Sequence, residues 1–578
     1  MRSRKTTIGL LGALALVGMG VYRLRRQLMR RVLGLGPVRY TVSVRRDLRV
    51  AMPDGVQLAT DHYAPQGGRL HPTLLVRTPY GRSAAAGMSG LMAGFLAQRF
   101  AERGYNVVIQ DVRGRFDSGG EFDPFTSEAA DARATLVWLE QQPWFNGVLG
   151  MFGPSYLSYT QWAAAVGAPL YLRAIVPVIG GSQLPVMGMR DRAFAADMLL
   201  RWVQNLDNQQ RTNGWLGWLR NNRFSAMAQE RALQRAFNHL PLSEGDRLVA
   251  GRTVQFYQDW LVHRDVNEPY WKRVNLGAQA QRVTAAVHLV GGWYDILLRE
   301  TLDDYQALRL AGRWPHLTIG PWTHWDRAVL REAMYQALAW FDAYLKGDRR
   351  SLRTNPVRFY LMGENRWCEL ESWPPPAQPQ TIYLHPGGRL AFEPPTEDSA
   401  PDVYRYDPQD PTPAIGGPMM NQSAGRVDNR RLEARSDVLC FTSQPLEKTL
   451  QVVGPLRLTL YVRSSLEYTD FFGRLCDVQP NGRSYNVCDG LLRLVPEMGE
   501  NQPDGTRRIE VELWPTAYSF LPGHRLRLQV SSGAHPRWNR NPGTGEPLAS
   551  AVRLLPADQQ VYHDPQHPSA LTLPVASL

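Results

Sequence analysis

The sequence lacks the short motifs by which metal, nucleotide and redox enzymes are usually identified. It contains neither a G-x-x-x-x-G-K-[ST] phosphate loop nor an H-E-x-x-H zinc motif, and its glycine-rich stretch RGRFDSGGEF matches no phosphate loop. The four cysteines all lie in the last third of the chain, with no C-x-x-C or interleaved histidine spacing: Cys368, Cys440, Cys476 and Cys488. We therefore expect no metal site and no cofactor, and the cysteines leave one or two disulfides open without implying them.

Acidic residues are absent from the first 46 positions, which contain eleven arginines and lysines. The net charge of the whole chain is +12, so the remainder of the chain is nearly neutral. A protein that binds nucleic acid carries its excess of basic residues on a folded surface, whereas here the excess belongs to an N-terminal tail. We expect no nucleic-acid partner.

A hydrophobic run long enough to cross a bilayer comfortably is also missing. The most apolar stretch, residues 8–22, has about 15 residues where a bilayer core takes about 20, and arginines flank it on both sides. Its length suits a signal peptide, but only GMG at 18–20 resembles a cleavage site, and the arginines that follow oppose translocation. We predict that residues 1–38 form an uncleaved membrane anchor; the arginines after the run favour a cytoplasmic body but leave the membrane side open. The alternatives are a signal peptide, cleaved on export, and a peripheral amphipathic tail.

What is present is the composition of a large globular protein of several domains. Of the 578 residues 44% are hydrophobic, and 17 tryptophans and 23 tyrosines favour a large core with aromatic-lined clefts. From residue 39 to 182, short apolar runs such as PTLLVRTPYG and YNVVIQDVRG alternate with helical stretches such as SEAADARATLVWLEQQ. Strands that alternate with helices predict an open parallel sheet covered by helices.

Two further changes of pattern divide the chain. The strand signal vanishes between residues 183 and 279, where the sequence is helical in period and rich in tryptophan and phenylalanine, and the strand–helix alternation resumes from 280 to 350. Residues 351–578 contain alternating strands separated by proline, glycine and aspartate turns. We predict an α/β core in two parts, a helical cap inserted between them, and a C-terminal all-β sandwich or jelly-roll domain.

Three predicted strand ends carry reactive side chains. Ser155 follows the apolar run 148–152, Asp295 follows 287–290 through GGWY, and His324 follows 317–319 through GPWT. The order serine, acid, histidine, with each at a strand end, is that of an α/β-hydrolase triad. A serine hydroxyl is a poor nucleophile at neutral pH, so a histidine must accept its proton and a carboxylate must orient that histidine.

Each of these residues also has an ordinary structural interpretation. A serine between a strand and a helix is most often a helix N-cap, Asp295 suits a turn, and His324 between two tryptophans suits a packed core position. The strict elbow G-x-S-x-G fails as well, because Leu157 holds the place of its second glycine. The coincidence of order, strand-end placement and flanking glycines favours the catalytic interpretation.

Several longer stretches resemble one family, that of cocaine esterase-type (CocE/NonD) serine hydrolases, which is related to Xaa-Pro dipeptidyl-peptidases and α-amino acid ester hydrolases. The matching stretches run from about residue 40 to the C-terminus: RTPYGR, QDVRGRFDSGGEF, WLEQQPWFNGVLGMFGPSYLSYTQW, GGWYDI, GPWTHWD, WFDAYLKG, VRFYLMGENRW and PGHRLRLQVSSGAHPRWNRNPGTG. The resemblance implies an α/β-hydrolase core, a helical cap over its active site, and a jelly roll packed against the core.

The resemblance also implies roles for individual residues. Ser155 would be the nucleophile, His324 the general base and Asp295 the carboxylate that orients it, while the hydroxyl of Tyr80 and the N–H of Tyr156 would form the oxyanion hole. The family elbow is G-x-S-Y-x-G, from which this chain departs only at its last glycine, replaced by a serine at position 158. That position lies inside the following helix, so we expect a packing adjustment and no loss of catalysis.

The sequence thus predicts a serine hydrolase that cleaves an ester or amide bond of a small molecule or short peptide through an acyl-enzyme. Xaa-Pro dipeptidyl-peptidase or α-amino acid ester hydrolase activity is the alternative within enzymes, and both would need an acidic site for the free α-amine of the substrate. The alternative outside enzymes is a membrane-anchored binding protein whose hydrolase core has lost its activity. The identity of the acyl group, the membrane side and the oligomeric state, with a homodimer left open, do not follow from one sequence.

Overall fold

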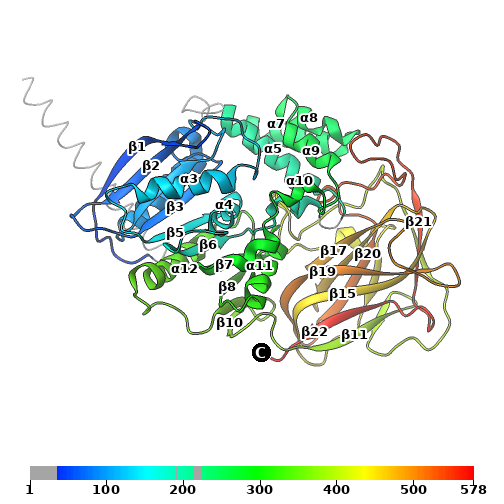
Figure 1. Ribbon diagram of the computed structural model, residues 1–578. Helices are drawn as coiled ribbons and strands as arrows, with labels where there is room; N and C mark the ends of the chain where they lie inside the picture. The colour runs from blue at the N-terminus through cyan, green and yellow to red at the C-terminus, as the bar shows by residue number, and fades with distance from the viewer. Residues whose placement is uncertain (1–34, 190–191, 212–222) are drawn as a thin grey trace, which may run out of the picture.

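The computed structural model describes residues 35–189, 192–211 and 223–578, which form two large β-sheets and a group of helices (Figure 1). The first sheet and its helices occupy the blue to green half of the molecule, and the second sheet occupies the yellow to red half. The predicted fold class is confirmed: an α/β core with a helical insertion, followed by a β-rich C-terminal domain. The exact domain boundaries given above stay a prediction.

The first sheet has ten strands in the order β1-β2-β4-β3-β5-β6-β7-β8-β9-β10. Their bounds are β1 Val42–Ala51, β2 Gln57–Pro65, β3 Thr73–Thr78, β4 Asn106–Asp111, β5 Leu149–Pro154, β6 Leu172–Val178, β7 Ala286–Tyr294, β8 His316–Thr323, β9 Val357–Leu361 and β10 Arg366–Leu370. The strands from β4 to β9 in this order pair in parallel, and antiparallel strands close both ends of the sheet. The carboxyl ends of the parallel strands therefore share one edge, where functional loops of such sheets lie.

Helices cover both faces of this sheet, which explains why its central strands are apolar on both sides. Their bounds are α2 Gly87–Ala101, α3 Glu128–Glu140, α4 Tyr156–Ala165, α11 Leu298–Leu310 and α12 Arg327–Lys346, with a short helix η1 at Ala84–Ala86. On one face α2 packs against α12, where the rings of Phe100 and Phe341 lie 6.0 Å apart. Helices α3, α4 and α11 contribute to a second core on the other face.

The inserted segment consists of short helices held by aromatic stacking. Their bounds are η2 Leu184–Met189, α5 Ala196–Arg211, α7 Arg223–Asn238, η3 Leu242–Glu244, α8 Gly245–Ala250, α9 Gln255–Val262, α10 Pro269–Lys272 and η4 Gly277–Arg282. Trp202 of α5 stacks on Trp260 of α9 with ring centroids 5.9 Å apart, and Phe256 lies 5.2 Å from Trp260. Large buried rings supply most of the apolar contact in such a small unit, which accounts for its tryptophan-rich sequence.

The second sheet comprises twelve strands. Their bounds are β11 Gln378–His385, β12 Arg389–Ala391, β13 Asp402–Tyr406, β14 Leu439–Thr442, β15 Leu450–Ser464, β16 Thr469–Val478, β17 Ser484–Leu494, β18 Glu500–Asn501, β19 Arg507–Phe520, β20 Arg525–Ser531, β21 Ala557–Tyr562 and β22 Ala570–Val575, with a helix α13 at Arg430–Glu433. Buried and exposed residues alternate along β15 and β19, as expected for strands with one face on a core. All four cysteines have free thiols, so no disulfide joins strands of this domain. Cys368 lies on β10 of the first sheet, and the other three lie in the second sheet.

Two strands lie in a different sheet from the one that their pattern suggested. The stretch VRFYLMGENRWCEL falls in the segment assigned to the β domain, yet it forms β9 and β10 of the first sheet, where β9 pairs with β8 in parallel. The residue Met362 between them also bridges to Tyr518 of the second sheet. An alternating hairpin indicates that one of its faces is buried but not which sheet it joins.

The prediction of a transmembrane helix is wrong for the residues that the structure describes. No helix in 35–189, 192–211 and 223–578 is long and apolar enough to cross a membrane. The longest, α12, is 20 residues long but carries charges along its length, among them Arg327, Glu332 and Lys346. The stretch 8–22, where the anchor was expected, lies outside the described residues, and its length of about 15 residues is below that of a bilayer span.

Candidate active site

Ser155 occupies a sharp turn between β5 and α4. Its φ of +58° and ψ of −125° lie outside the regions that non-glycine residues favour. Its N–H donates to the carbonyl of Val178 on the neighbouring strand β6, over 2.9 Å, and its side chain makes no capping hydrogen bond to α4. A capping serine would use its side-chain oxygen on the helix N–H groups and would not need a strained backbone. The geometry therefore argues against the helix-capping interpretation.

Small residues line the turn because other segments approach it closely. A Cβ on Gly153 would lie 2.4 Å from that of Leu157, and a Cβ on Gly180 would lie 2.5 Å from Ser158. Ser158 is completely buried in α4, and its hydroxyl has no hydrogen-bond partner among the described residues. The serine that replaces the family glycine thus fits against Gly180, but it places a polar atom where nothing satisfies it.

We expect Ser158→Ala to raise the free energy of unfolding by up to about 1 kcal/mol, because folding removes its hydroxyl from water without a replacement hydrogen bond. Gly180→Ala should lower it by about 1–3 kcal/mol, because the added methyl overlaps Ser158. Ser158→Gly should recover most of that loss in the double variant. Thermal unfolding of these variants measures the coupling, and an equal loss from Gly180→Ala in both backgrounds would show that the two residues do not contact one another.

His324 and Asp295 come from the ends of β8 and β7 and meet Ser155 at the same edge of the sheet. The Nε2 atom of His324 lies 3.2 Å from the Oγ of Ser155, and its Nδ1 lies 2.8 Å from Oδ2 of Asp295. Asp295 is fully buried, and its Oδ1 accepts a hydrogen bond from the N–H of Leu297 over 2.8 Å. The carboxylate is therefore fixed on both oxygens, and the three predicted residues form one continuous chain of contacts.

Tyr80, at the end of β3, lies beside this chain. Its hydroxyl accepts a hydrogen bond from the Nε1–H of Trp202, 3.1 Å away on helix α5, and Tyr80 lines the same cavity as Ser155. Burial raises the pKa of Tyr80, so the hydroxyl keeps its proton at neutral pH and above. Because Trp202 donates to the oxygen of Tyr80, the hydroxyl hydrogen of Tyr80 remains available for another acceptor. The helical periodicity of the cap sequence could not have assigned this contact to Trp202.

Tyr156 is the first residue of α4, so its N–H has no acceptor within the helix. Its side chain turns away from Ser155: the hydroxyl donates to Oε1 of Glu128 over 2.9 Å and accepts from the N–H of Phe125 over 2.8 Å. Glu128 in turn forms a buried ion pair with Arg77, 2.7 Å apart. These contacts hold the first residue of α4 in place through its side chain. No motif or pattern in the sequence had indicated Glu128 or Arg77.

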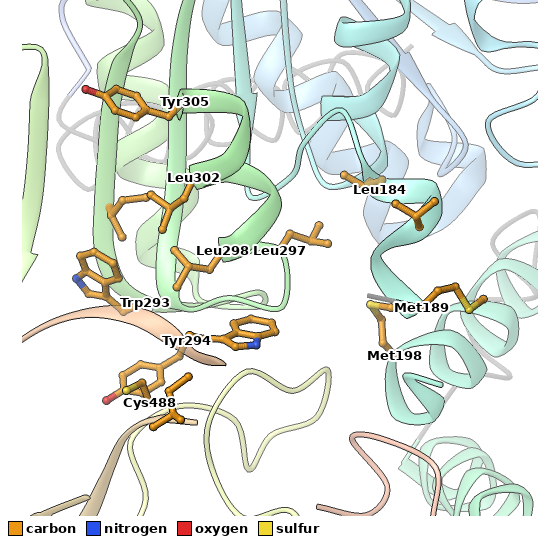
Figure 2. Close-up of a cluster of buried hydrophobic side chains, with 14 of the residues drawn as sticks. Leu184, Met189, Met198, Trp293, Tyr294, Leu297, Leu298, Leu302, Tyr305 and Cys488 are labelled. Atoms are coloured by element: carbon orange, nitrogen blue, oxygen red, sulfur yellow. The ribbon is translucent and has the colours of Figure 1, made fainter. Parts of the chain in front are cut away.

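The cavity at Ser155 is narrow and mainly apolar. It measures about 30 Å³, and Tyr80, Tyr156 and His324 line it together with Ser155. Its other lining residues are apolar or aromatic: Phe125, Leu184, Met187, Met198, Leu199, Trp202, Ile296, Leu297 and Met420. Figure 2 shows Leu297 on one side, and Leu184 and Met198 on the other. Methionine side chains adapt their shape readily. Met187, Met198 and Met420 are therefore the lining residues best able to move aside for a ligand.

One of these methionines, Met420, is held in place through its backbone. Its N–H donates to Oδ2 of Asp197 at the start of α5 over 2.9 Å, and its carbonyl accepts from the Nε1–H of Trp325 over 3.0 Å. Trp325 directly follows His324 in the chain, while Asp197 also pairs with Arg201 at 2.6 Å. The loop that carries Met420 is thus tied both to the cap and to the residue next to the histidine.

Comparison with known proteins gives the family of the two domains. Residues 54–326 match the model of the X-Pro dipeptidyl-peptidase (S15) family, and residues 351–572 match that of the X-Pro dipeptidyl-peptidase C-terminal non-catalytic domain. Cocaine esterase from Rhodococcus sp. (strain MB1 Bresler) is 33% identical over 92% of this chain and 98% of its own length. Among solved structures, an α-amino acid ester hydrolase has a TM-score of 0.76 at 23% identity, covering 94% of this chain and 98% of its own. An aminopeptidase from a marine sediment Thaumarchaeota archaeon has a TM-score of 0.75 at 23% identity, covering 93% of this chain and 97% of its own.

Proposed function

The chain belongs to the family of S15 peptidases and cocaine esterase-like CocE/NonD serine hydrolases, and on that premise we propose that it hydrolyses esters with apolar acyl groups through Ser155, His324 and Asp295. The observation that carries the proposal is the unbroken chain of contacts from Oγ of Ser155 through His324 to Asp295, at 3.2 and 2.8 Å. Both distances are within the reach that proton transfer and orientation require.

In the proposed reaction, the Oγ of Ser155 attacks the ester carbonyl while Nε2 of His324 takes its proton. The imidazolium then gives that proton to the departing alcohol, which leaves an acyl group on Ser155. Water, deprotonated by His324, attacks the acyl carbonyl and releases the acid. Asp295 keeps the Nδ1–H of His324 directed towards itself and stabilises the imidazolium in both halves of the cycle.

The negative charge on the carbonyl oxygen needs donors that are in place before the reaction. The proposed donors are the N–H of Tyr156 and the hydroxyl of Tyr80. The strained turn at Ser155 supports the first, because it places the N-terminal end of α4 beside the nucleophile. The burial of Tyr80, which keeps its hydroxyl protonated, supports the second.

We expect Tyr80→Phe to lower kcat for a p-nitrophenyl ester by about 10²- to 10³-fold with little change in KM, because an oxyanion donor acts mainly in the transition state. Trp202→Phe removes the donor to the Tyr80 oxygen and part of the ring that stacks on Trp260, and should cost much less. Steady-state kinetics of both variants test the assignment. A Tyr80→Phe enzyme with wild-type kcat would remove Tyr80 from the oxyanion hole.

The lining of the cavity favours a simple ester over a substrate with a free α-amine. Among the described residues that line it, none carries a carboxylate, and the walls that would meet an acyl group are hydrocarbon, thioether or aromatic. A charged ammonium placed there would lose its hydration without a counter-charge, which is costly. Xaa-Pro dipeptidyl-peptidase and amino acid ester hydrolase activities are therefore the weaker proposals, and a degenerate binding protein has no need of an aligned triad.

A direct test combines labelling with a comparison of substrates. A fluorophosphonate probe should label the native protein and fail to label the heated protein or the Ser155→Ala variant. Hydrolysis of p-nitrophenyl butyrate and benzoate should exceed that of Gly-Pro-p-nitroanilide by several orders of magnitude in kcat/KM. Preferred cleavage of the dipeptide anilide would replace the ester assignment by a peptidase, and an unlabelled native protein would revive the binding-protein alternative.

The clamp on Met420 leads to a prediction about acyl binding. Trp325→Phe deletes the donor to the Met420 carbonyl, a hydrogen bond worth about 1 kcal/mol, so KM for a p-nitrophenyl ester should rise about 5-fold while kcat changes less. Trp314→Phe is a matched control, because Trp314 is an exposed tryptophan outside the cavity. A fall in kcat alone would indicate instead that Trp325 acts on the neighbouring His324.

A further inference from the structure

A second cavity, of about 610 Å³, shares a wall with the one at Ser155. The short helix η2 contributes to both: Leu184 and Met187 line the cavity at Ser155, while Val186 and Met189 line the larger one. Figure 2 labels Leu184 and Met189 on this helix. The remaining walls come from the cap, the α/β core and β17, so the second cavity lies where three parts of the chain meet.

The polar lining of this second cavity is rich in hydrogen-bond donors. Three guanidinium groups, three carboxamides and two carboxylates line it: Arg192, Arg264, Arg493, Gln183, Asn267, Asn275, Asp265 and Glu300. Guanidinium groups only donate hydrogen bonds, and an amide NH₂ group donates two. Because the three guanidinium groups outnumber the two carboxylates, an oxyanion, which only accepts hydrogen bonds, matches this lining better than an ammonium.

Arg264 is the less exposed of two guanidinium groups, with Arg192, that have no anionic partner among the described residues. Among the described residues no carboxylate pairs with it: one Nη atom lies 2.7 Å from the thioether sulfur of Met189, and the other donates to the carbonyl of Arg192 over 2.8 Å. A thioether is a weak acceptor. Burial and the nearby charge of Arg493 lower the pKa of the Arg264 guanidinium, which marks a cation in an environment that would gain from an anion.

Two of the other charged groups around this cavity, Arg493 and Asp265, have different partners. Arg493 forms a two-pronged ion pair with Asp470, at 2.9 and 2.8 Å, and also donates to Asn539. Asp265 accepts from the backbone and the side chain of Asn267, over 2.9 and 3.0 Å, and no ion pair joins it to Arg264. Among the described residues, Arg264 is therefore the partly buried cation of this cavity that no carboxylate neutralises.

We propose that this cavity binds a small organic carboxylate, with its oxygens on Arg264 and its hydrocarbon part against the apolar lining. That lining consists of Val186, Met189, Val266 and Val495. The two oxygens of a carboxylate match the fork of a guanidinium, while the four apolar side chains exclude water around the body of the ligand. The site is separate from Ser155 and does not depend on the proposed ester hydrolysis.

Titration of the full-length protein with 4-fluorobenzoate, followed by calorimetry and ¹⁹F NMR, tests the site. We expect saturable binding of one equivalent by the wild type, at least tenfold weaker binding by Arg264→Met, and weaker binding of inorganic phosphate than of the aromatic acid. Arg313→Met is the control, because Arg313 lines a different cavity and should leave binding unchanged. KM for a neutral p-nitrophenyl ester should be unchanged in Arg264→Met.

A second pair of variants decides the matter if Arg264→Met does not fold. Val266→Glu places a carboxylate inside the cavity, where it would pair with Arg264 and exclude the ligand, whereas Val266→Gln has the same size without the charge. We expect binding to be lost only in the glutamate variant. Undiminished binding in Arg264→Met or in Val266→Glu would overturn the proposal. So would a rise of the ester KM that parallels the loss of binding, since the acid would then occupy the cavity at Ser155.

Discussion

Ser155→Ala is expected to lower kcat for p-nitrophenyl esters by about 10⁵- to 10⁶-fold and to abolish labelling by a fluorophosphonate. The variant removes the atom that would attack the carbonyl, while the proposed oxyanion donors and the apolar cavity remain. A residual rate above that of water is therefore expected, because those donors still stabilise the charge that develops on the substrate. Ester hydrolysis under substrate saturation, with the uncatalysed rate subtracted, measures the effect.

Two matched variants separate loss of the nucleophile from loss of the fold. Ser158→Ala, one helical turn further along α4, removes a hydroxyl that makes no hydrogen bond and should keep kcat within about twofold of the wild-type value. Ser155→Gly should be as inactive as Ser155→Ala. Its free energy of unfolding should be higher than that of Ser155→Ala by about 1 kcal/mol or more, because glycine adopts a φ of +58° without strain. Full turnover by Ser155→Ala would end the assignment of Ser155.

A stability gain in Ser155→Gly would have a further meaning. It would show that the turn after β5 is maintained against the conformational preference of its own residue. Strain of this kind persists where the surrounding structure over-determines it, and here the Ser155 N–H is held by Val178 while Leu157 lies directly over Gly153. The strained turn would then present the nucleophile at the edge of the sheet and would lower the free energy of unfolding. The gain in stability of Ser155→Gly would measure that cost.

The sequence was sufficient to predict the α/β core, the helical insertion and the β-rich domain, since each follows from a local period in the distribution of apolar residues. It also brought Ser155, Asp295 and His324 together, because parallel strands place their carboxyl ends on one edge. What it could not give were contacts between elements far apart in the chain. The hydrogen bond from Trp202 to Tyr80 spans 122 positions, and that from Met420 to Asp197 spans 223.

Such contacts depend on how the elements pack, which periodicity does not determine. The same limit explains β9 and β10, whose alternating pattern suits either sheet, and the buried pair of Arg77 and Glu128, whose sequence context is unremarkable. Arg264 is a further example. A lone arginine after a helix predicts a solvated side chain, and only the folded chain shows that it meets Met189 and Arg192 with no acidic partner in the described part of the chain.

Asp295→Asn is expected to lower kcat by about 10⁴-fold while the protein keeps its fold and its KM. The amide oxygen can still accept the hydrogen bond from Leu297, so the local backbone should be retained. The amide cannot stabilise the imidazolium of His324, and its NH₂ group favours the tautomer in which Nδ1 has no proton, so that Nε2 is protonated and cannot accept one from Ser155. Pre-steady-state kinetics with a p-nitrophenyl ester should show a slow acylation step with no burst.

Asp304→Asn is the control for removing a buried carboxylate near the same strand end. Asp304 lies on α11 and accepts hydrogen bonds from Ser182, over 2.7 and 2.5 Å, and has no contact with His324. Burial raises its pKa to about 8, so it is largely protonated at pH 7, and the neutral asparagine should be tolerated with little change in kcat. An equal loss in both variants would mean that replacing any buried carboxyl group in this region, not loss of the orientation of His324, limits the rate.

The decisive comparison is between Asp295→Asn alone and Asp295→Asn combined with Ser155→Ala. If the three residues act as one unit, the double variant should be no slower than Ser155→Ala, because His324 has no proton to accept once Oγ is gone. If the two residues contributed independently, the losses in kcat would multiply to about 10⁹- to 10¹⁰-fold. The double variant would then be slower than the residual rate that the oxyanion donors alone would sustain. A double variant slower than Ser155→Ala by a further 10⁴-fold would show that Asp295 stabilises the protein or the substrate by a route other than His324.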